Sequence, residues 1–174
     1  HGVPGALMSM LGISFLDEIV NNRKITDSAR ILNELRKEVI RALRQKGEKK
    51  EAKDGMDISL CVIDRSEKRI QYSGAYNNLY LAREGEITEY HADRMPIGIF
   101  DISENEFGSQ SMTYKPGDMI YLYSDGFADQ FGGPGGKKFK YGAFKRLLAE
   151  TSPEPLSIQK KKIEKVFHDW KGNN

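Results

Sequence analysis

Apolar residues recur at helical spacing over the first part of the chain. Residues 1–20 carry them three or four positions apart, at Val3, Leu7, Met10, Leu11, Phe15 and Ile19. Residues 26–46 repeat the pattern at Ile31, Leu35, Val39, Ala42 and Leu43, after a choice of capping residues in Thr26, Asp27 and Ser28. The pattern therefore predicts a pair of helices, followed by a charged loop over residues 46–55.

From Met56 the apolar period changes from that of a helix to that of a strand. Met56, Ile58, Leu60 and Val62 fall on one face of an extended segment. The sequence RSEK at 65–68 predicts a turn, and further short strands follow that are broken at Gly74, Asn77, Asn78 and Gly85. This part of the chain predicts an antiparallel sheet.

Residues 107–126 predict a hairpin with Lys115-Pro116-Gly117-Asp118 at its tip. Proline followed by glycine is typical of a type II turn, so we interpret Asp118 as a turn residue and not as a ligand. The strand that follows, 119–125, is apolar on both faces, which predicts burial on both sides within a layered structure.

Two more helices are predicted after the glycines, over 141–150 and 156–171. The second has an apolar face formed by Ile163, Val166, Phe167 and Trp170. Two helices, a long antiparallel stretch and two helices predict an α+β fold in which helices pack on the sheet. The length of 174 residues favours a single domain over 1–174.

The composition narrows the class of protein. Hydrophobic residues make up 39% and charged residues 30%, as in soluble globular proteins. The net charge of +2 gives no reason to expect a nucleic acid or an anionic membrane as partner. Cys61 is the single cysteine, which fits a reducing compartment, and no apolar run is long enough to insert into a bilayer. We expect a cytoplasmic domain cut from a longer protein.

Asp125 is the first candidate for chemistry, because it ends an apolar strand and is followed by Gly126. A carboxylate held at a strand end suits Mg²⁺ or Mn²⁺. Asp129 shares its face if residues 126–129 form one helical turn. The alternative is that Asp125 caps a short helix and Asp129 is solvated, and the spacing alone does not decide between the two.

Two glycine-rich stretches offer weaker hints of an anion site. The opening HGVPGA places the free N–H groups of a helix start next to His1 and Gly2, which could bind an anion. An ordinary helix start without a ligand explains the same sequence equally well. The stretch FGGPGGKKFKYG lacks the Gly-Lys-[Ser/Thr] ending of a phosphate-binding loop, because Lys137 is followed by Lys138. We interpret it as a flap beside a site whose lysines steer anions. Cys61 is expected in the core, and His91 and His168 as surface or packing residues.

Six segments taken in order resemble one known family. They are HGVPGALMSMLG, DGMDISLCVID, YSGAYNNLYLAREGEI, RMPIGI, YKPGDMIYLYSDGFADQFGG and KKFKYGAFKRLL. The family is the SpoIIE-like (RsbU-like) bacterial branch of the PPM phosphatases, which include protein phosphatase 2C. The resemblance covers nearly the whole chain. It implies an antiparallel β-sandwich flanked by helices, in four α-β-β-α layers, incomplete here at both termini.

The resemblance also implies a chemistry and a set of site residues. Family members hydrolyse phosphoserine or phosphothreonine with a water activated by two Mn²⁺ or Mg²⁺ ions. On this basis Asp125 is a metal ligand, Gly126 permits its turn, and Asp129 has a supporting role, as His1 and Gly2 do at the helix start. The implied substrate is a phosphorylated anti-sigma-factor antagonist, and the implied partner within the parent chain is a sensor domain.

Three departures from the family pattern limit these expectations. The first metal-binding aspartate of the family lies just before the chain begins, and another lies after it ends. Tyr76 stands where some members have an aspartate for a third ion. We therefore expect this segment to bind metal weakly or not at all, to be inactive by itself, and to self-associate through exposed strand edges. The alternatives are a non-catalytic interaction module on the same fold, in which Asp125 is structural, and a nucleotide-binding regulator that uses the glycine-rich flap.

Overall fold

The computed structural model describes residues 2–45, 55–99 and 105–172. The chain divides into two compact units. The first comprises His1–Asn78 and Tyr90–Tyr114, and the second comprises Leu79–Glu89 and Lys115–Asn174.

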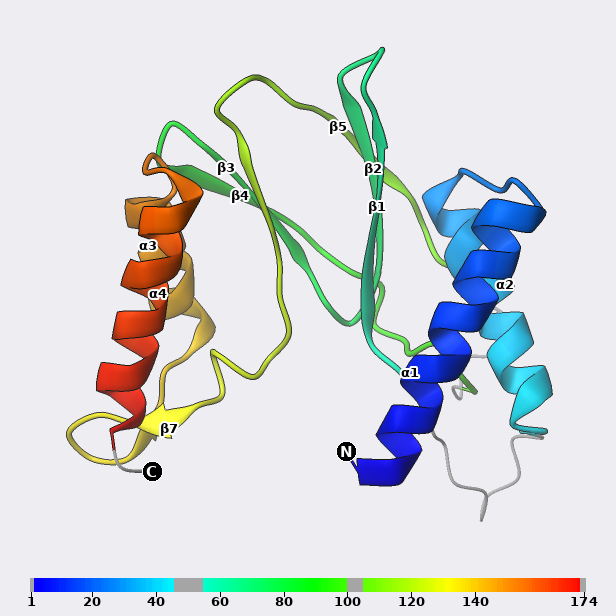
Figure 1. Cartoon of the computed structure of the whole chain (residues 1–174), viewed down its shortest axis with the longest axis horizontal. Helices are drawn as coiled ribbons and strands as arrows, with labels where there is room; N and C mark the ends of the chain where they lie inside the picture. Colours follow the sequence, from blue (N-terminus) through cyan, green and yellow to red (C-terminus); the bar gives the residue numbers. More distant parts are fainter. Residues whose placement is uncertain (1, 46–54, 100–104, 173–174) are drawn as a thin grey trace. The chain divides into compact units, whose positions relative to one another are not determined.

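The helices of the first unit are α1 (Gly2–Asp17), the π-helix η1 (Glu18–Asn22) that continues it, and α2 (Ser28–Ala42) (Figure 1). Of the three possible capping residues, Asp27 caps α2, since its Oδ1 accepts a hydrogen bond of 2.8 Å from the Arg30 N–H. The predicted pair of helices is confirmed.

The face that α1 turns to the core differs in part from the predicted one. Met8, which is outside the predicted face, is buried, whereas Leu7 and Met10 are 51% and 69% exposed. Two other residues of the predicted face do lie at the core: Phe15 packs against it, and Ile19, in η1, is fully buried. The reason is that α1 has no charged residue before Asp17, so its apolar residues surround the helix and their spacing does not single out one face.

The sheet of the first unit contains β1 (Ile58–Asp64), β2 (Arg69–Ala75) and β5 (Gln110–Thr113), in the order β1-β2-β5. Both pairings are antiparallel, with Cys61 opposite Tyr72 and Ile70 opposite Met112. The predicted face of Met56, Ile58, Leu60 and Val62 packs against the core of this unit. The strand assignment from the period of two is therefore confirmed.

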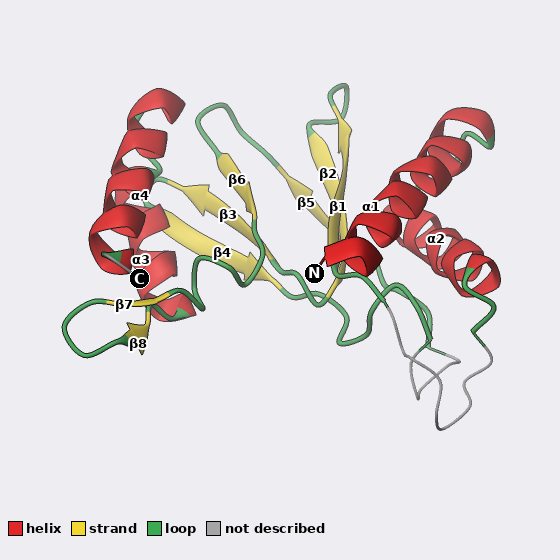
Figure 2. Ribbon diagram, turned by 60° about the horizontal axis from the view of Figure 1, so that its bottom comes forward, coloured by secondary structure: helices red, strands yellow, loops and turns green. Residues whose placement is uncertain are grey.

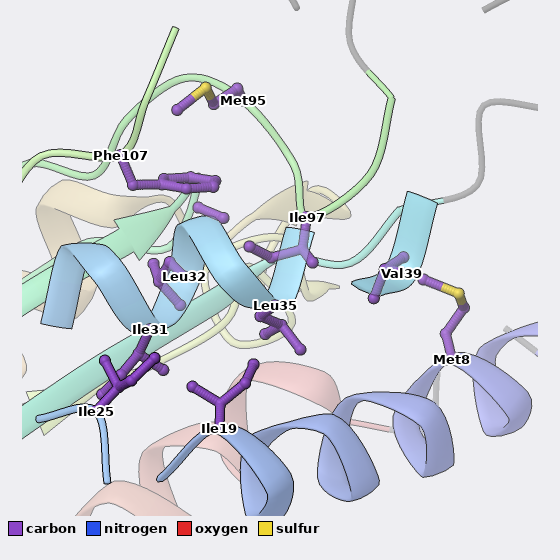
Figure 3. Close-up of a cluster of buried hydrophobic side chains, with 11 residues drawn as sticks. Met8, Ile19, Ile25, Ile31, Leu32, Leu35, Val39, Met95, Ile97 and Phe107 are labelled. Carbon is purple, nitrogen blue, oxygen red and sulfur yellow. The ribbon is translucent and has the colours of Figure 1, made fainter. Parts of the chain in front are cut away.

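The core of the first unit lies where α2 meets α1 and the sheet. Ile31, Leu35 and Val39 of α2 are fully or almost fully buried, as predicted, whereas Ala42 at the end of the helix is exposed. Figure 3 shows Ile31, Leu35 and Val39 together with Met8 from α1 and Ile19 from η1. Ile97, from the segment that precedes β5, completes this group.

The second unit combines a three-stranded sheet, a small hairpin and two helices (Figure 2). The sheet has the order β4-β3-β6, with β3 at Leu79–Arg83, β4 at Glu86–Tyr90 and β6 at Met119–Leu122. The hairpin pairs β7 (Phe131–Gly132) with β8 (Lys137–Lys138). The helices are α3 (Tyr141–Thr151) and α4 (Leu156–Lys171), and both predicted helices are confirmed.

The predicted hairpin over residues 107–126 is wrong, because its two strands belong to different sheets. β5 pairs with β2, and β6 pairs with β3. The turn between them is nevertheless of the predicted kind: Gly117 has φ +93°, and the Asp118 N–H donates to the Lys115 carbonyl at 3.1 Å. Local turn chemistry thus fixed the reversal of the chain but not the partners of the strands.

Burial of β6 on both faces is also wrong for the described residues. The strand ends at Leu122, whose side chain is 49% exposed, while Tyr121 packs into the core of the second unit. β6 is the last strand in the order β4-β3-β6, and the described part of this unit does not cover the Leu122 face.

Helices and antiparallel sheets in both units confirm the α+β class. None of the described helices combines the length and the apolar character needed to cross a membrane.

Candidate metal centre

Asp125 opens a single helical turn that follows β6. The Asp129 N–H donates to the Asp125 carbonyl at 2.8 Å, as in an α-helix. The turn predicted for residues 126–129 is therefore confirmed, and it brings the two acidic residues to the same side of the chain.

An aromatic cluster holds this turn in place. The Phe127 ring lies 4.8 Å from the Phe144 ring, 5.0 Å from Phe167 and 5.1 Å from Phe139, measured between centroids. Ala128 is fully buried. Since these contacts come from α3, α4 and the segment before α3, the backbone that carries Asp125 is fixed by the packing of the whole second unit.

The Asp125 carboxylate itself is exposed, and within the described residues it has no hydrogen-bond or ion-pair partner. A carboxylate with free oxygens on a rigid turn has the donor chemistry that Mg²⁺ and Mn²⁺ prefer.

Asp129 is different, because Lys138 from β8 pairs with its carboxylate at 2.7 Å. Both side chains are nearly half exposed, so the pair contributes little stability, but it neutralises Asp129 and sets its direction. From the sequence, Lys138 was expected only to steer anions. Asp129 and Lys138 face each other because the β7–β8 hairpin folds back on the chain. No local sequence pattern reveals this pairing.

Tyr141, the first residue of α3, was not among the residues that the sequence pattern singled out. Its pKa is raised by burial first, and then by the negative charges of Asp125 and Asp129. The residue is nevertheless 45% exposed, and no hydrogen bond joins its phenol to either carboxylate among the described residues.

Gly126 plays a smaller part than expected. Its φ is not positive, and a Cβ at this position would meet only the Ser124 Oγ at 3.7 Å, which is ordinary contact. The turn therefore does not require a glycine for its backbone conformation. Gly2 begins α1 in the first unit, and His1 lies outside the described residues.

The glycine-rich flap is the β7–β8 hairpin. Its base is tied to α4, since the Gly133 N–H donates to the Trp170 carbonyl at 2.8 Å and the Trp170 indole donates to the Gln130 carbonyl at 3.0 Å. The hairpin carries Lys138 to Asp129, so it does lie beside the candidate site.

Cys61 lies in β1, is partly buried and has a thiol whose pKa is raised by burial to about 11. A thiol of this kind stays protonated at neutral pH, which agrees with a packing role and not with a nucleophile.

The donor set fits one carboxylate ligand and not a complete two-metal centre. Among the residues that the structure describes, no three His, Cys, Asp or Glu side chains come close enough to hold a metal ion. Two Mn²⁺ or Mg²⁺ ions need several oxygen ligands. Asp125 can supply one of them, and the others would come from outside the described residues.

The chain is similar to a solved phosphatase domain. It aligns over its full length with the SiaA-PP2C domain of Pseudomonas aeruginosa, with 28% sequence identity and a TM-score of 0.84. It spans 65% of that chain. A comparison with curated proteins finds no match.

Two structures from Bacillus subtilis share the fold. The SpoIIE phosphatase domain in a crystal form without domain swapping aligns with 97% of this chain and 68% of its own, at 18% identity and a TM-score of 0.56. The same domain presoaked with Mn aligns with 90% of this chain and 63% of its own, at 19% identity and a TM-score of 0.51. At these identities the likeness concerns the fold alone.

The expected PPM-like fold and the resemblance to the SpoIIE branch are both confirmed by these findings. The family model described as Stage II sporulation protein E (SpoIIE) matches residues 1–173, and the chain therefore belongs to the SpoIIE family of PP2C-type phosphatase domains.

Proposed function

We propose that this chain is the larger part of a metal-dependent serine/threonine protein phosphatase domain in which Asp125 is a ligand of Mn²⁺ or Mg²⁺. The observation that carries the proposal is the free, exposed Asp125 carboxylate on a turn pinned by Phe127. Membership of the SpoIIE family and the likeness to the SiaA-PP2C domain support it.

The residues around Asp125 have roles that follow from their contacts. Asp129 is paired with Lys138, so the two side chains together add little net charge next to Asp125. The pair also fixes the direction of the Asp129 carboxylate. Tyr141, whose phenol is influenced by the charges of Asp125 and Asp129, has a hydroxyl that could donate to a phosphoryl oxygen. The metal ions, when bound, would supply a water acidic enough to attack phosphorus at neutral pH.

The substrate that we propose is a phosphoserine protein of the anti-sigma-factor antagonist type, and the partner in the parent chain is a sensor domain. Self-association through strand edges and a cytoplasmic location remain predictions. β1 and β5 form the two edges of the described sheet in the first unit, which is where such pairing would begin.

The test is Mn²⁺-dependent release of phosphate from a phosphoserine protein by a longer protein that contains this chain. The comparison is between the wild type, Asp125→Asn, and the control Asp169→Asn, which makes the same change at an exposed ion pair of α4. We expect Asp125→Asn to lower kcat at least about a hundredfold with its fold intact, because a lost metal ligand weakens charge stabilisation in the transition state. The control should stay within twofold of wild type.

Two results would contradict the proposal. Equal activity in the wild type and Asp125→Asn would remove Asp125 from the metal site. No activity in any variant, together with no Mn²⁺ binding, would favour the non-catalytic interaction module instead.

A further inference from the structure

The end of the β7–β8 hairpin is bonded through its backbone to the turn that opens at Asp125. The Phe139 N–H donates to the Gln130 carbonyl at 3.1 Å, and the Lys140 N–H donates to the Ala128 carbonyl at 2.7 Å. These two bonds fix the chain directly after β8 against the turn, so the last residue of β8 lies beside the turn.

Side-chain contacts hold the hairpin in the same place. The Phe139 ring lies 5.1 Å from the Phe127 ring and 5.3 Å from the Trp170 ring, measured between centroids. The backbone at Gly132 packs so closely against Trp170 that a Cβ there would overlap the Trp170 carbonyl oxygen. The position of Lys138, the last residue of β8, is therefore set by the packing of the second unit and not by its own ion pair.

The ammonium of Lys138 meets two groups that favour a cation. Its Nζ lies 2.7 Å from the Asp129 Oδ2 and 5.9 Å from the centroid of the Phe131 ring. A lysine ammonium is attracted both to a carboxylate and to the face of an aromatic ring. The two contacts direct a side chain that is otherwise free to rotate, so a positive charge stands at the Asp129 carboxylate before any metal ion arrives.

The two carboxylates of the turn thus differ in what they offer to a metal ion. Asp125 is exposed and has no hydrogen-bond or ion-pair partner within the described residues, whereas Asp129 is paired with the ammonium. The bond from the Asp129 N–H to the Asp125 carbonyl places the two residues one helical turn apart, on the same face. Without the ammonium, both carboxylates would offer oxygens to one divalent cation, and oxygens are the ligands that Mn²⁺ prefers.

We propose that Lys138 is an intramolecular cation that keeps divalent metal ions off Asp129 and leaves Asp125 as the one carboxylate that the turn offers to a metal ion. A divalent ion at Asp129 must displace the ammonium, and the displaced ammonium, still nearby, repels it. Lys138 therefore acts through Asp129 as a positioning residue and does not touch the metal. The role of Asp125 rests on the proposed function, but exclusion of metal from Asp129 can be measured without catalysis.

The test is a titration of the full chain with Mn²⁺, followed by the paramagnetic broadening of the backbone amide resonances of residues 125–130. Lys138→Met nearly keeps the length of the side chain and removes its charge. We expect it to lower the Kd for Mn²⁺ about tenfold, as for removal of one unit charge next to a divalent ion near a protein surface. The control is Lys137→Met, which removes the same charge from the neighbouring exposed residue of β8 and should change the Kd less than about threefold.

A second substitution shows whether the gain in affinity passes through Asp129. Adding Asp129→Asn to Lys138→Met should return the Kd to within about twofold of wild type, because the freed carboxylate is then gone. The amide spectrum recorded before Mn²⁺ is added reports whether each variant is folded. The proposal is overturned if the gain survives Asp129→Asn, or if Lys138→Met gains no more affinity than Lys137→Met does.

The same titrations separate this proposal from the proposed function. If the gain in Lys138→Met is lost with Asp129→Asn but kept with Asp125→Asn, Lys138 does exclude metal from Asp129, and the assignment of Asp125 as a ligand fails. If Asp125→Asn abolishes binding while Lys138→Met binds Mn²⁺ as wild type does, Asp125 keeps its role and exclusion by Lys138 is wrong.

Discussion

Replacing Asp118 with asparagine removes the charge from a carboxylate that is only 4% exposed. Asp118 accepts hydrogen bonds from Arg83 Nε at 2.9 Å, from Arg83 Nη2 at 2.6 Å and from the Lys115 N–H at 2.7 Å. These bonds fasten the 115–118 turn to β3. Asparagine has nearly the same shape, so the variant tests the charge and not the packing.

The expected loss of stability follows from this geometry. Removing one partner of a fully buried ion pair costs about 3–5 kcal/mol. The Arg83 side chain is 37% exposed and regains water when its partner is neutral, which lowers the cost. We therefore expect Asp118→Asn to lower the free energy of unfolding by about 2 kcal/mol, since charged hydrogen bonds contribute about 1.5–3 kcal/mol.

Urea denaturation of the purified chain measures this loss. With a slope of about 2 kcal/mol per molar urea, the midpoint should fall by about 1 M. Asp169→Asn is the matched control, because its ion pair with Lys165 is exposed and should contribute less than about 0.5 kcal/mol. If Asp118→Asn changes the midpoint no more than Asp169→Asn, the inference from burial and bond geometry is wrong.

The Asp118–Arg83 ion pair also predicts how the free energy of unfolding depends on pH. The hydrogen bonds from Arg83 are the main cause that lowers the pKa of Asp118 below its ordinary value. A carboxyl group with a lowered folded pKa stabilises the protein fully above the unfolded pKa of about 3.9, and this contribution declines as the pH falls towards the folded pKa. The difference between wild type and Asp118→Asn should therefore be constant near neutral pH and shrink below about pH 4.

Three further substitutions test the packing, each by its effect on the urea midpoint. Tyr123→Phe removes a buried hydroxyl that makes no well-formed hydrogen bond among the described residues and interacts with the Tyr80 hydroxyl, so stability should change by less than about 1 kcal/mol, and a larger loss would show that the Tyr80–Tyr123 interaction is strong. Gly132→Ala would place a Cβ against the Trp170 carbonyl oxygen and should cost about 1–3 kcal/mol. The control Gly142→Ala, in α3, where a Cβ would meet only Arg146 Nη1 at 4.0 Å, should be neutral or stabilising. Leu35→Ala, fully buried in the first unit, should cost about 2–5 kcal/mol, and the same change at half-exposed Leu7 should cost less than about 1 kcal/mol; similar losses at the two sites would contradict the burial of Leu35.

The candidate site was predictable from the sequence only in part. Asp125 could be found because it follows an apolar segment and opens a turn within a recognisable motif, although the strand itself ends earlier, at Leu122. The partner of Asp129 could not, because Lys138 reaches it only when the β7–β8 hairpin folds back. No sequence motif pointed to Tyr141 either. The charges of Asp125 and Asp129 act on it only because α3 begins directly after the β7–β8 hairpin.

The sequence by itself determined most elements of this protein: the four α-helices from their apolar spacing, the existence of short strands from their period of two, the 115–118 turn from Pro116 and Gly117, and the family from its ordered motifs. It did not predict the π-helix η1 or the β7–β8 strands. The tertiary structure alone decided that β5 pairs with β2 and β6 with β3, and that α1 turns Met8 inward and leaves Met10 exposed. The physical reason is that periodicity and turn chemistry act between residues close in the chain, whereas strand partners, the buried face of an all-apolar helix and the contacts of a charged side chain depend on residues that only folding brings together.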